Sequence, residues 1–309
     1  MKVSTEISSA ARLVGEEKAI ELCAKAGFDG WDFSMFKMRT YHWPTGTWLD
    51  SGHPLGKPTY QQFYDWSKSA WIPKEEIGTP EYLRFARQLK KVADDNGIVC
   101  NQSHAPFPTK GLGFMDYLKR AIECTAEAGG KIVIIHPDND KTPEGNAEIY
   151  NELLPFAKDH GVKIATENMY NWKAELDQAG FAACATAESF VAHLNAVNDE
   201  DFVACLDLGH AEMKPAGDGA VKMIHALGDK LQALHIHDTD CRHDNHQIPF
   251  SLKQDFGAMA KALKEIGYKG WFTLEADSYL GKFTAETALD GLKDLHAAVR
   301  KFAAMFEEA

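Results

Sequence analysis

Short apolar segments alternate with amphipathic segments along the whole chain, and this alternation limits the folds that the sequence can adopt. Eight segments have the length and apolar content of buried β-strands: residues 2–7, 28–34, 98–104, 131–136, 162–167, 202–208, 231–237 and 270–276. Eight segments with helical patterning follow them, at about residues 15–26, 79–96, 113–128, 144–159, 184–197, 216–228, 252–266 and 283–306. Eight strand–helix units in 309 residues predict one α/β domain, a (β/α)8 TIM barrel spanning residues 1–309.

The main alternative fold is an open, doubly wound parallel sheet. Such a sheet normally carries a glycine-rich phosphate-binding turn after an early strand. The sequence contains no Gly-x-Gly-x-x-Gly motif. We therefore favour the barrel and expect no nucleotide cofactor.

One long stretch, at about residues 35–78, lacks a regular pattern and is rich in aromatic side chains. Its aromatic residues include Tyr41, Trp43, Trp48, Tyr60, Phe63, Tyr64, Trp66 and Trp71. In a barrel this stretch follows the second strand, on the face where TIM barrels carry their active sites. One interpretation is a lid or wall over a substrate, with Trp43 in contact with it. A packed insertion or a subunit contact is the other interpretation.

Charge and hydropathy narrow the range of partners. The formal net charge is −12, which repels the phosphate backbone of nucleic acids, so we expect a small-molecule partner instead. No apolar run approaches the roughly 20 residues of a membrane helix. The first residues lack the apolar stretch of a signal peptide, so we expect a cytoplasmic protein with no membrane partner. The sequence leaves open whether the chain forms a homo-oligomer.

Ligand-type side chains follow six successive predicted strands at the point where each strand ends. They are His104, His136, Glu167, Asp207 with His210, His235 and His237 followed by Asp244 and His246, and Glu275. A carboxylate or imidazole just past an apolar strand is costly to bury unless a function requires it. The carboxyl ends of barrel strands meet at one face, so these side chains should share one site. Oxygen and nitrogen ligands together are typical of a divalent metal site, which points to an enzyme.

The seventh strand offers two candidate ligands, His235 and His237. They are two residues apart, so both point to the same side of the strand. One of them can bind a metal ion directly while the other contacts substrate or orients a neighbour.

Four of these segments resemble, in order, motifs of the xylose isomerase-like TIM-barrel superfamily. They are Thr166-Glu167-Asn168, Leu206-Asp207-Leu208-Gly209-His210, His235-Ile236-His237-Asp238 and Leu274-Glu275. The resemblance covers nearly the whole chain. The superfamily includes the sugar phosphate isomerase/epimerase family with its ketose 3-epimerases, inosose dehydratase-like proteins, and the zinc-dependent abasic-site nuclease endonuclease IV.

Resemblance to the ketose 3-epimerases implies one divalent metal ion, such as Mn, Mg, Co or Zn. Its ligands would be Glu167, Asp207, His235 and Glu275. The family's His-x-x-acid pattern fits both His235 and His237, and we prefer His235 because His-Ile-His-Asp resembles other branches of the superfamily. Substrate contacts would come from His104, His136, His210, His237, Arg242, Asp244 and His246, together with Trp43.

The reaction implied by this resemblance is a sugar isomerisation or epimerisation in carbohydrate metabolism. A metal ion would bind the carbonyl and an adjacent hydroxyl of an open-chain sugar and stabilise an enediolate. Glu167 and Glu275 would remove and return the proton, on the same carbon in an epimerase or on the next carbon in an isomerase.

Three alternatives stay open. An inosose dehydratase-like lyase would use the same type of site, and a non-catalytic binding protein would bind no metal and turn over no sugar. A nuclease is the third, because nine residues match the zinc-ligand positions of endonuclease IV, where three zinc ions would fit. They are His104, His136, Glu167, Asp207, His210, His235, Asp244, His246 and Glu275. The acidic charge and the aromatic stretch at residues 35–78 favour a small polyol over a DNA duplex.

Overall fold

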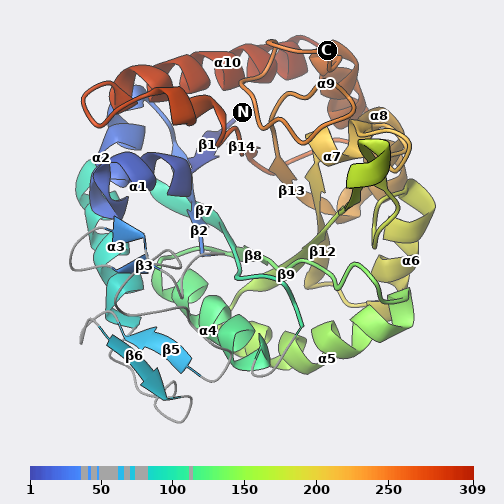
Figure 1. The fold of residues 1–309 in the computed structure, drawn as a ribbon, viewed down its shortest axis with the longest axis horizontal. Helices are drawn as coiled ribbons and strands as arrows, with labels where there is room; N and C mark the ends of the chain where they lie inside the picture. The colour runs from blue at the N-terminus through green and yellow to red at the C-terminus, as the bar shows by residue number, and fades with distance from the viewer. Residues whose placement is uncertain (36–40, 43–46, 49–61, 66–69, 74–82, 111–113) are drawn as a thin grey trace.

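Eight parallel strands form a nearly closed barrel with helices around it (Figure 1). The computed structural model describes residues 1–35, 41–42, 47–48, 62–65, 70–73, 83–110 and 114–309. The barrel strands are β1 (Val3–Glu6), β2 (Gly30–Ser34), β7 (Val99–His104), β8 (Ile132–Ile134), β9 (Lys163–Glu167), β12 (Phe202–Asp207), β13 (Leu231–His235) and β14 (Phe272–Leu274). The predicted TIM-barrel fold is confirmed.

The order of strands around the barrel is β13-β12-β9-β8-β7-β2-β1-β14. The two ends of this order meet just beyond β13, where Ile236 pairs in parallel with Leu274. The Ile236 amide donates to the Thr273 carbonyl at 2.9 Å, and the Glu275 amide donates to the Ile236 carbonyl at 3.0 Å. These two bonds bring the ends of β13 and β14 together, so the residues that follow both strands share one face.

The helices form the outer ring (Figure 1). They are α1 (Ser8–Val14), α2 (Glu16–Ala26), α3 (Arg84–Asn96), α4 (Phe114–Glu127), α5 (Pro143–Asp159), α6 (Ala187–Val197), α7 (Leu208–Glu212), α8 (Ala220–Leu227), α9 (Phe256–Glu265) and α10 (Ala288–Glu308). A helix lies within each predicted helical segment, and where the structure describes the ends they differ from the predicted ones by a few residues. The sequence did not predict α1 or α7, which are short and follow directly after β1 and β12.

Local chemistry explains several helix ends. The Thr142 side chain accepts a hydrogen bond from the Gly145 amide, and Pro143 occupies the first turn of α5. Gly15, with a φ of +82°, separates α1 from α2. Asp207 begins α7 by accepting from the His210 amide at 2.6 Å. That cap fixes the Asp207 side chain at the end of β12.

In the part of the chain that the structure describes, three pairs of short antiparallel strands interrupt the strand–helix alternation. They are β3 (Tyr41–His42) with β4 (Thr47–Trp48), β5 (Gln62–Asp65) with β6 (Ala70–Pro73), and β10 (Asn171–Lys173) with β11 (Gln178–Gly180). The first two lie in the aromatic stretch at residues 35–78, which is therefore not wholly irregular. Apart from Met35, the rest of that stretch lies outside the described residues, and its role as a lid, a packed insertion or a subunit contact stays a prediction.

The barrel interior is apolar on one side and polar on the other. An apolar cluster comes from strands β8, β9, β12 and β13, and it comprises Ile134, Ala165, Val203, Cys205 and Ala233. Opposite it, the Ser4 hydroxyl donates to Thr273 Oγ1 at 2.9 Å, and the Thr273 hydroxyl donates to Gln102 Oε1 at 3.2 Å. Gln102 and Thr273 belong to strands that are not neighbours, so their bond crosses the barrel.

The main core lies between the strands and the helices, because both faces of a parallel barrel strand are covered. All six residues of β12 are buried. The chain ends meet beside α10, where the Met1 ammonium pairs with Glu307. Among the helices of the described residues, none combines the length and apolar character that crossing a membrane requires.

Replacing Phe272 by Ala should test this core. The Phe272 side chain is fully buried, and its ring centroid lies 4.7 Å from that of Phe302 and 5.5 Å from that of Phe306. Phe272→Ala should lower the free energy of unfolding by about 3–5 kcal/mol in urea titrations. Phe181→Ala is the control, because Phe181 is 64% exposed, and its effect should stay within about 0.5 kcal/mol. Equal effects would contradict the described packing.

Candidate active site

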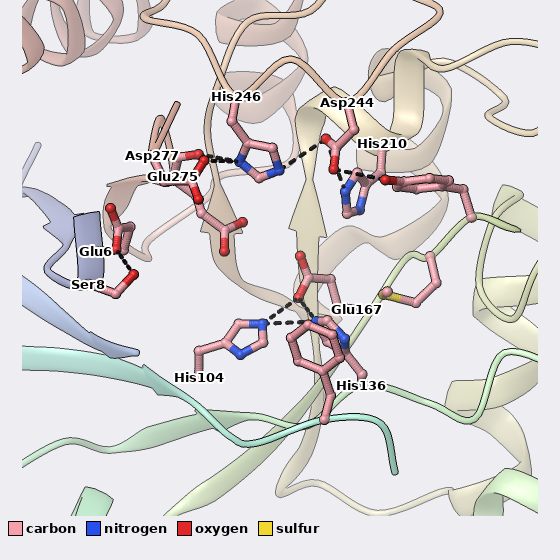
Figure 2. A pocket seen from close by; sticks show the side chains of 13 residues that line it. Glu6, Ser8, His104, His136, Glu167, His210, Asp244, His246, Glu275 and Asp277 are labelled. Carbon is pink, nitrogen blue, oxygen red and sulfur yellow. Dashed lines mark hydrogen bonds and ion pairs between the residues drawn. The ribbon is translucent and has the colours of Figure 1, made fainter. Parts of the chain in front are cut away.

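The carboxyl ends of the barrel strands surround a cavity of about 330 Å³ (Figure 2). Seven of the predicted site residues line it: His104, His136, Glu167, His210, Asp244, His246 and Glu275. Three more, Asp207, His235 and His237, are at most 1% exposed and belong to the side-chain clusters described below. The structure thus brings together ten of the residues singled out from strand ends.

One predicted substrate contact, Arg242, lies away from the cavity. Arg242 is exposed, and its guanidinium group pairs with the Asp177 carboxylate at 2.7 Å and donates to the Asp177 carbonyl at 2.6 Å. Asp177 directly precedes β11, so Arg242 fastens its own loop to this hairpin and does not line the cavity. Trp43 lies outside the described residues.

Four side chains form what we call the carboxylate cluster: Glu167, Asp207, His235 and Glu275. One ligand atom of each lies within 4.8 Å of those of the other three. His235 Nδ1 is 2.8 Å from Glu167 Oε1 and 3.2 Å from Glu275 Oε2. The geometry therefore groups His235, and not His237, with the three carboxylates.

The two glutamates of this cluster differ in their proton affinity. Burial raises the pKa of Glu275 to about 7, and the nearby Glu167 carboxylate adds to this while His235 opposes it. Burial acts in the same direction on Glu167. For Glu167, however, the attraction of His235 and the hydrogen bonds from His104 and His136 outweigh the effect of burial. They hold the Glu167 pKa well below its usual range. Two carboxyl groups with separated pKa values are suited to acid and base roles.

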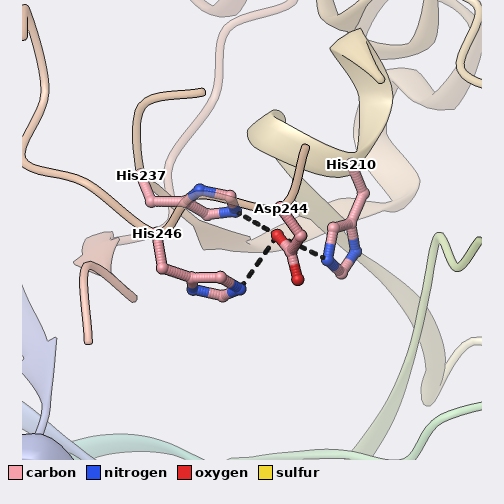
Figure 3. Close-up of side chains that lie close together, drawn as sticks. All are labelled: His210, His237, Asp244 and His246. Atoms are coloured by element: carbon pink, nitrogen blue, oxygen red, sulfur yellow. Dashed lines mark ion pairs between the residues drawn. The ribbon is translucent and has the colours of Figure 1, made fainter. Parts of the chain in front are cut away.

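A second group, the histidine cluster, consists of His210, His237, Asp244 and His246 (Figure 3). Asp244 Oδ1 lies 3.0 Å from His246 Nε2, 3.4 Å from His210 Nε2 and 3.7 Å from His237 Nε2. The three imidazoles thus surround one carboxylate oxygen.

Backbone carbonyls determine which ring nitrogens face this carboxylate. His210 Nδ1 is 2.9 Å from the Asn168 carbonyl, and His246 Nδ1 is 2.6 Å from the Glu275 carbonyl. A carbonyl oxygen only accepts, so each Nδ1 must carry the hydrogen. Each Nε2 then faces Asp244. In the protonated imidazole Nε2 carries a hydrogen, and in the neutral imidazole it carries a lone pair that could bind a cation. Burial opposes protonation of His210, but Asp207 and Asp244 outweigh it and raise the His210 pKa to about 10.

A third group consists of His104, His136 and Glu167, and it shares Glu167 with the carboxylate cluster. His136 Nε2 lies 3.1 Å from Glu167 Oε2 and 2.8 Å from His104 Nε2. Because each Glu167 oxygen meets a different imidazole, this carboxylate is held in one orientation between β8 and β13.

Sequence reasoning missed several residues around the cavity. Glu6, at the end of β1, is buried and accepts hydrogen bonds from Ser8 and Ser9. The strand-end rule would have found Glu6 had it been applied to the first strand. Asp277 lines the same rim, and the Tyr170 hydroxyl donates to Asp244 Oδ2 at 3.0 Å. No sequence pattern identifies Asp277 or Tyr170, because each lies two or more residues beyond the end of a strand.

Comparison with known proteins agrees with this fold. Residues 20–295 match the family described as xylose isomerase-like TIM barrel. The match spans most of the chain, so the protein belongs to this family, which confirms the resemblance seen in the sequence motifs.

Individual relatives are distant. Inosose dehydratase of Serratia proteamaculans is 25% identical over 277 residues, which cover 76% of this chain and 88% of the relative. A structure of L-ribulose 3-epimerase has a TM-score of 0.67 at 15% identity and covers 100% of this chain and 96% of its own. The structure of the IOLI protein with a zinc atom has a TM-score of 0.65 at 19% identity. The match covers 98% of this chain and 99% of the IOLI chain. At these identities the solved structures show the shared fold alone.

Gly209 is required by the position of His237. A Cβ atom at residue 209 would lie 2.1 Å from His237 Cε1, which is far below van der Waals contact. Gly209→Ala should therefore displace His237 and lower the free energy of unfolding by about 1–3 kcal/mol, as measured in urea. Gly281→Ala, where a Cβ meets nothing within 4 Å, should stay within about 0.5 kcal/mol. If Gly209→Ala were equally neutral, the placement of His237 would be wrong.

Proposed function

We propose that this protein is a divalent-metal-dependent isomerase or epimerase that moves a proton next to the carbonyl group of a sugar or related polyol. The observation that supports this most directly is the pair Glu167 and Glu275. They come from opposite sides of the β12–β13 pair, line the same cavity and both contact His235. The family match and the epimerase-like neighbours support the same class of reaction.

The carboxylate cluster has the chemistry of a divalent metal site. Glu167, Asp207 and His235 are almost fully buried, and Glu275 is mostly so. Three carboxylates and one imidazole at this spacing carry excess negative charge that burial makes costly unless a cation is near. Such oxygen-rich ligation suits Mn, Mg, Co or Zn. A cation held there would act as a Lewis acid that polarises the carbonyl group of the substrate.

The protein's own groups supply the proton transfer. Without a bound cation, the pKa of Glu167 is well below its usual range and that of Glu275 is raised to about 7, so the two carboxylates differ in proton affinity, as base and acid roles require. One glutamate takes the proton from the carbon beside the carbonyl, and the other returns it. His104 and His136 keep the Glu167 carboxylate in place during this exchange.

The cavity also favours an uncharged substrate. Its volume of about 330 Å³ is near the lower end of small-molecule sites. Among the described residues that line it, none is Lys or Arg, and five are acidic: Glu6, Glu167, Asp244, Glu275 and Asp277. This lining favours a free sugar or polyol over a sugar phosphate.

Deuterium exchange tests the proton transfer. The metal-loaded protein is incubated in D2O with a panel of ketoses, aldoses and inosose, and proton NMR follows exchange at carbons beside the carbonyl. Glu167→Gln and Glu275→Gln should each slow exchange by about 10²–10⁴-fold, because each removes a group that transfers the proton at nearly constant volume. Glu265→Gln on the exposed surface of α9 is the matched control and should exchange at the wild-type rate.

Metal content is measured in the same samples, so that loss of metal is not read as loss of a base. Retained exchange in both cavity variants would reject the two-glutamate mechanism. Loss of water from the inosose, in place of exchange alone, would identify a dehydratase, the activity named for the Serratia relative.

Metal binding should also stabilise the fold. Because the site forms only in the folded chain, free metal at 100 times its Kd should add about 2.7 kcal/mol to the free energy of unfolding. Asp207→Asn should lose most of this gain while retaining the cap of α7, since Asn also caps helices. Asp199→Asn, which affects a carboxylate paired with Lys158 at 2.8 Å, should keep the gain. Equal gains in both variants would exclude the carboxylate cluster as the metal site.

A zinc-dependent nuclease is the second candidate. The nine residues that resemble the endonuclease IV ligands fall into the three clusters described above, each able to offer ligands to an ion. The net charge of −12 and the acidic cavity oppose binding of DNA. Nicking of a duplex with an abasic site, abolished by chelator, would establish this activity, and uptake of three zinc ions without sugar exchange would favour it.

A further inference from the structure

A buried carboxylate, Asp32, lies against the carboxylate cluster without belonging to it. Asp32 is fully buried in the middle of β2 and does not line the cavity. Its Oδ2 atom is 3.4 Å from His235 Nε2 and accepts from Gln102 Nε2 at 2.9 Å. Its Oδ1 atom has no hydrogen-bond partner among the described residues. A carboxylate with one unsatisfied oxygen inside a barrel is costly, so it calls for an explanation.

The contact between Asp32 and His235 explains why this carboxylate is buried here. The imidazole of His235 has carboxylates on both sides, with Glu167 and Glu275 at Nδ1 and Asp32 at Nε2. A neutral imidazole carries one hydrogen and one lone pair. If Nε2 donates its hydrogen to Asp32, the lone pair of Nδ1 points into the carboxylate cluster.

A chain of buried polar groups holds Asp32 in this position. A shift in the register of β2 against β7 between Trp31 and Asp32 sets Asp32 beside Gln102. Gln102 Oε1 accepts from the Thr273 hydroxyl, so the amide must present its NH2 end to Asp32. The Thr273 hydroxyl in turn accepts from Ser4. The polar side of the barrel interior therefore determines the orientation of one carboxylate beneath the site.

We propose that Asp32 is a positioning residue that fixes the tautomer and ring orientation of His235, so that Nδ1 faces the cation site. The proposal rests on the proposed function only in assuming that the carboxylate cluster binds a divalent cation. Asp32 acts through His235 and touches neither substrate nor metal. A purely structural role for Asp32 predicts lost stability with unchanged metal affinity.

Asp32→Asn tests this, because it removes the charge at nearly constant volume. Metal affinity is measured on the apo protein by competition with a chromophoric chelator for Zn²⁺ and Mn²⁺, with stability measured in parallel. Asp32→Asn should weaken metal binding by about 10–100-fold. Asp29→Asn is the matched control, three residues earlier in the chain. Asp29 accepts from the Val3 amide and pairs with Arg300 at 2.8 Å, so its loss should leave metal affinity unchanged.

A second measurement needs no variant. Long-range ¹H–¹⁵N NMR of the Zn²⁺-loaded wild-type protein should show His235 with its hydrogen on Nε2. The opposite tautomer, or an unchanged affinity in Asp32→Asn, would overturn the role of Asp32. Absence of metal binding by the wild type at the carboxylate cluster would instead reject the proposed function, so the two failures are distinguishable.

Discussion

The structure depends on a concentration of buried charge at one end of the barrel. Parallel strands bring their carboxyl ends to one face, and here that face receives carboxylates and imidazoles that are mostly buried. Such groups are tolerated only as mutually paired sets. The pairing of His235 with Glu167 and of Asp244 with three imidazoles therefore offsets part of the cost of burying these groups.

Much of this arrangement could be predicted from local sequence patterns. The apolar runs predicted the strands, and the position of Glu167, Asp207 or Glu275 at the end of a run was enough to assign each residue to the face at the carboxyl ends of the strands. A TIM barrel places every strand end at the same level, so residues far apart in sequence could be assigned to one site without knowledge of their contacts.

What the sequence could not supply depends on register and on long-range partners. The motif resemblance already grouped His235 with Glu167, Asp207 and Glu275, but the placement of His237 beside Asp244 depends on the loop that follows β13. Asp32 is a polar residue in the middle of a strand, and its partner His235 is 203 residues away. Arg242 was expected in the cavity, but Asp177, in a hairpin segment that was not predicted, holds it at the surface.

Two residues, Glu167 and Asp207, connect the clusters to one another, and this has a thermodynamic consequence. Glu167 contacts His136 as well as His235, and Asp207 contacts His237 at 3.1 Å while belonging to the carboxylate cluster. A proton or ion taken up by one cluster changes the charge that its neighbour experiences. Linkage then requires that the neighbour alter the first cluster's affinity by the same factor. Protonation of the three clusters should therefore be coupled, and the cation affinity of the carboxylate cluster should depend on the protonation state of the other two.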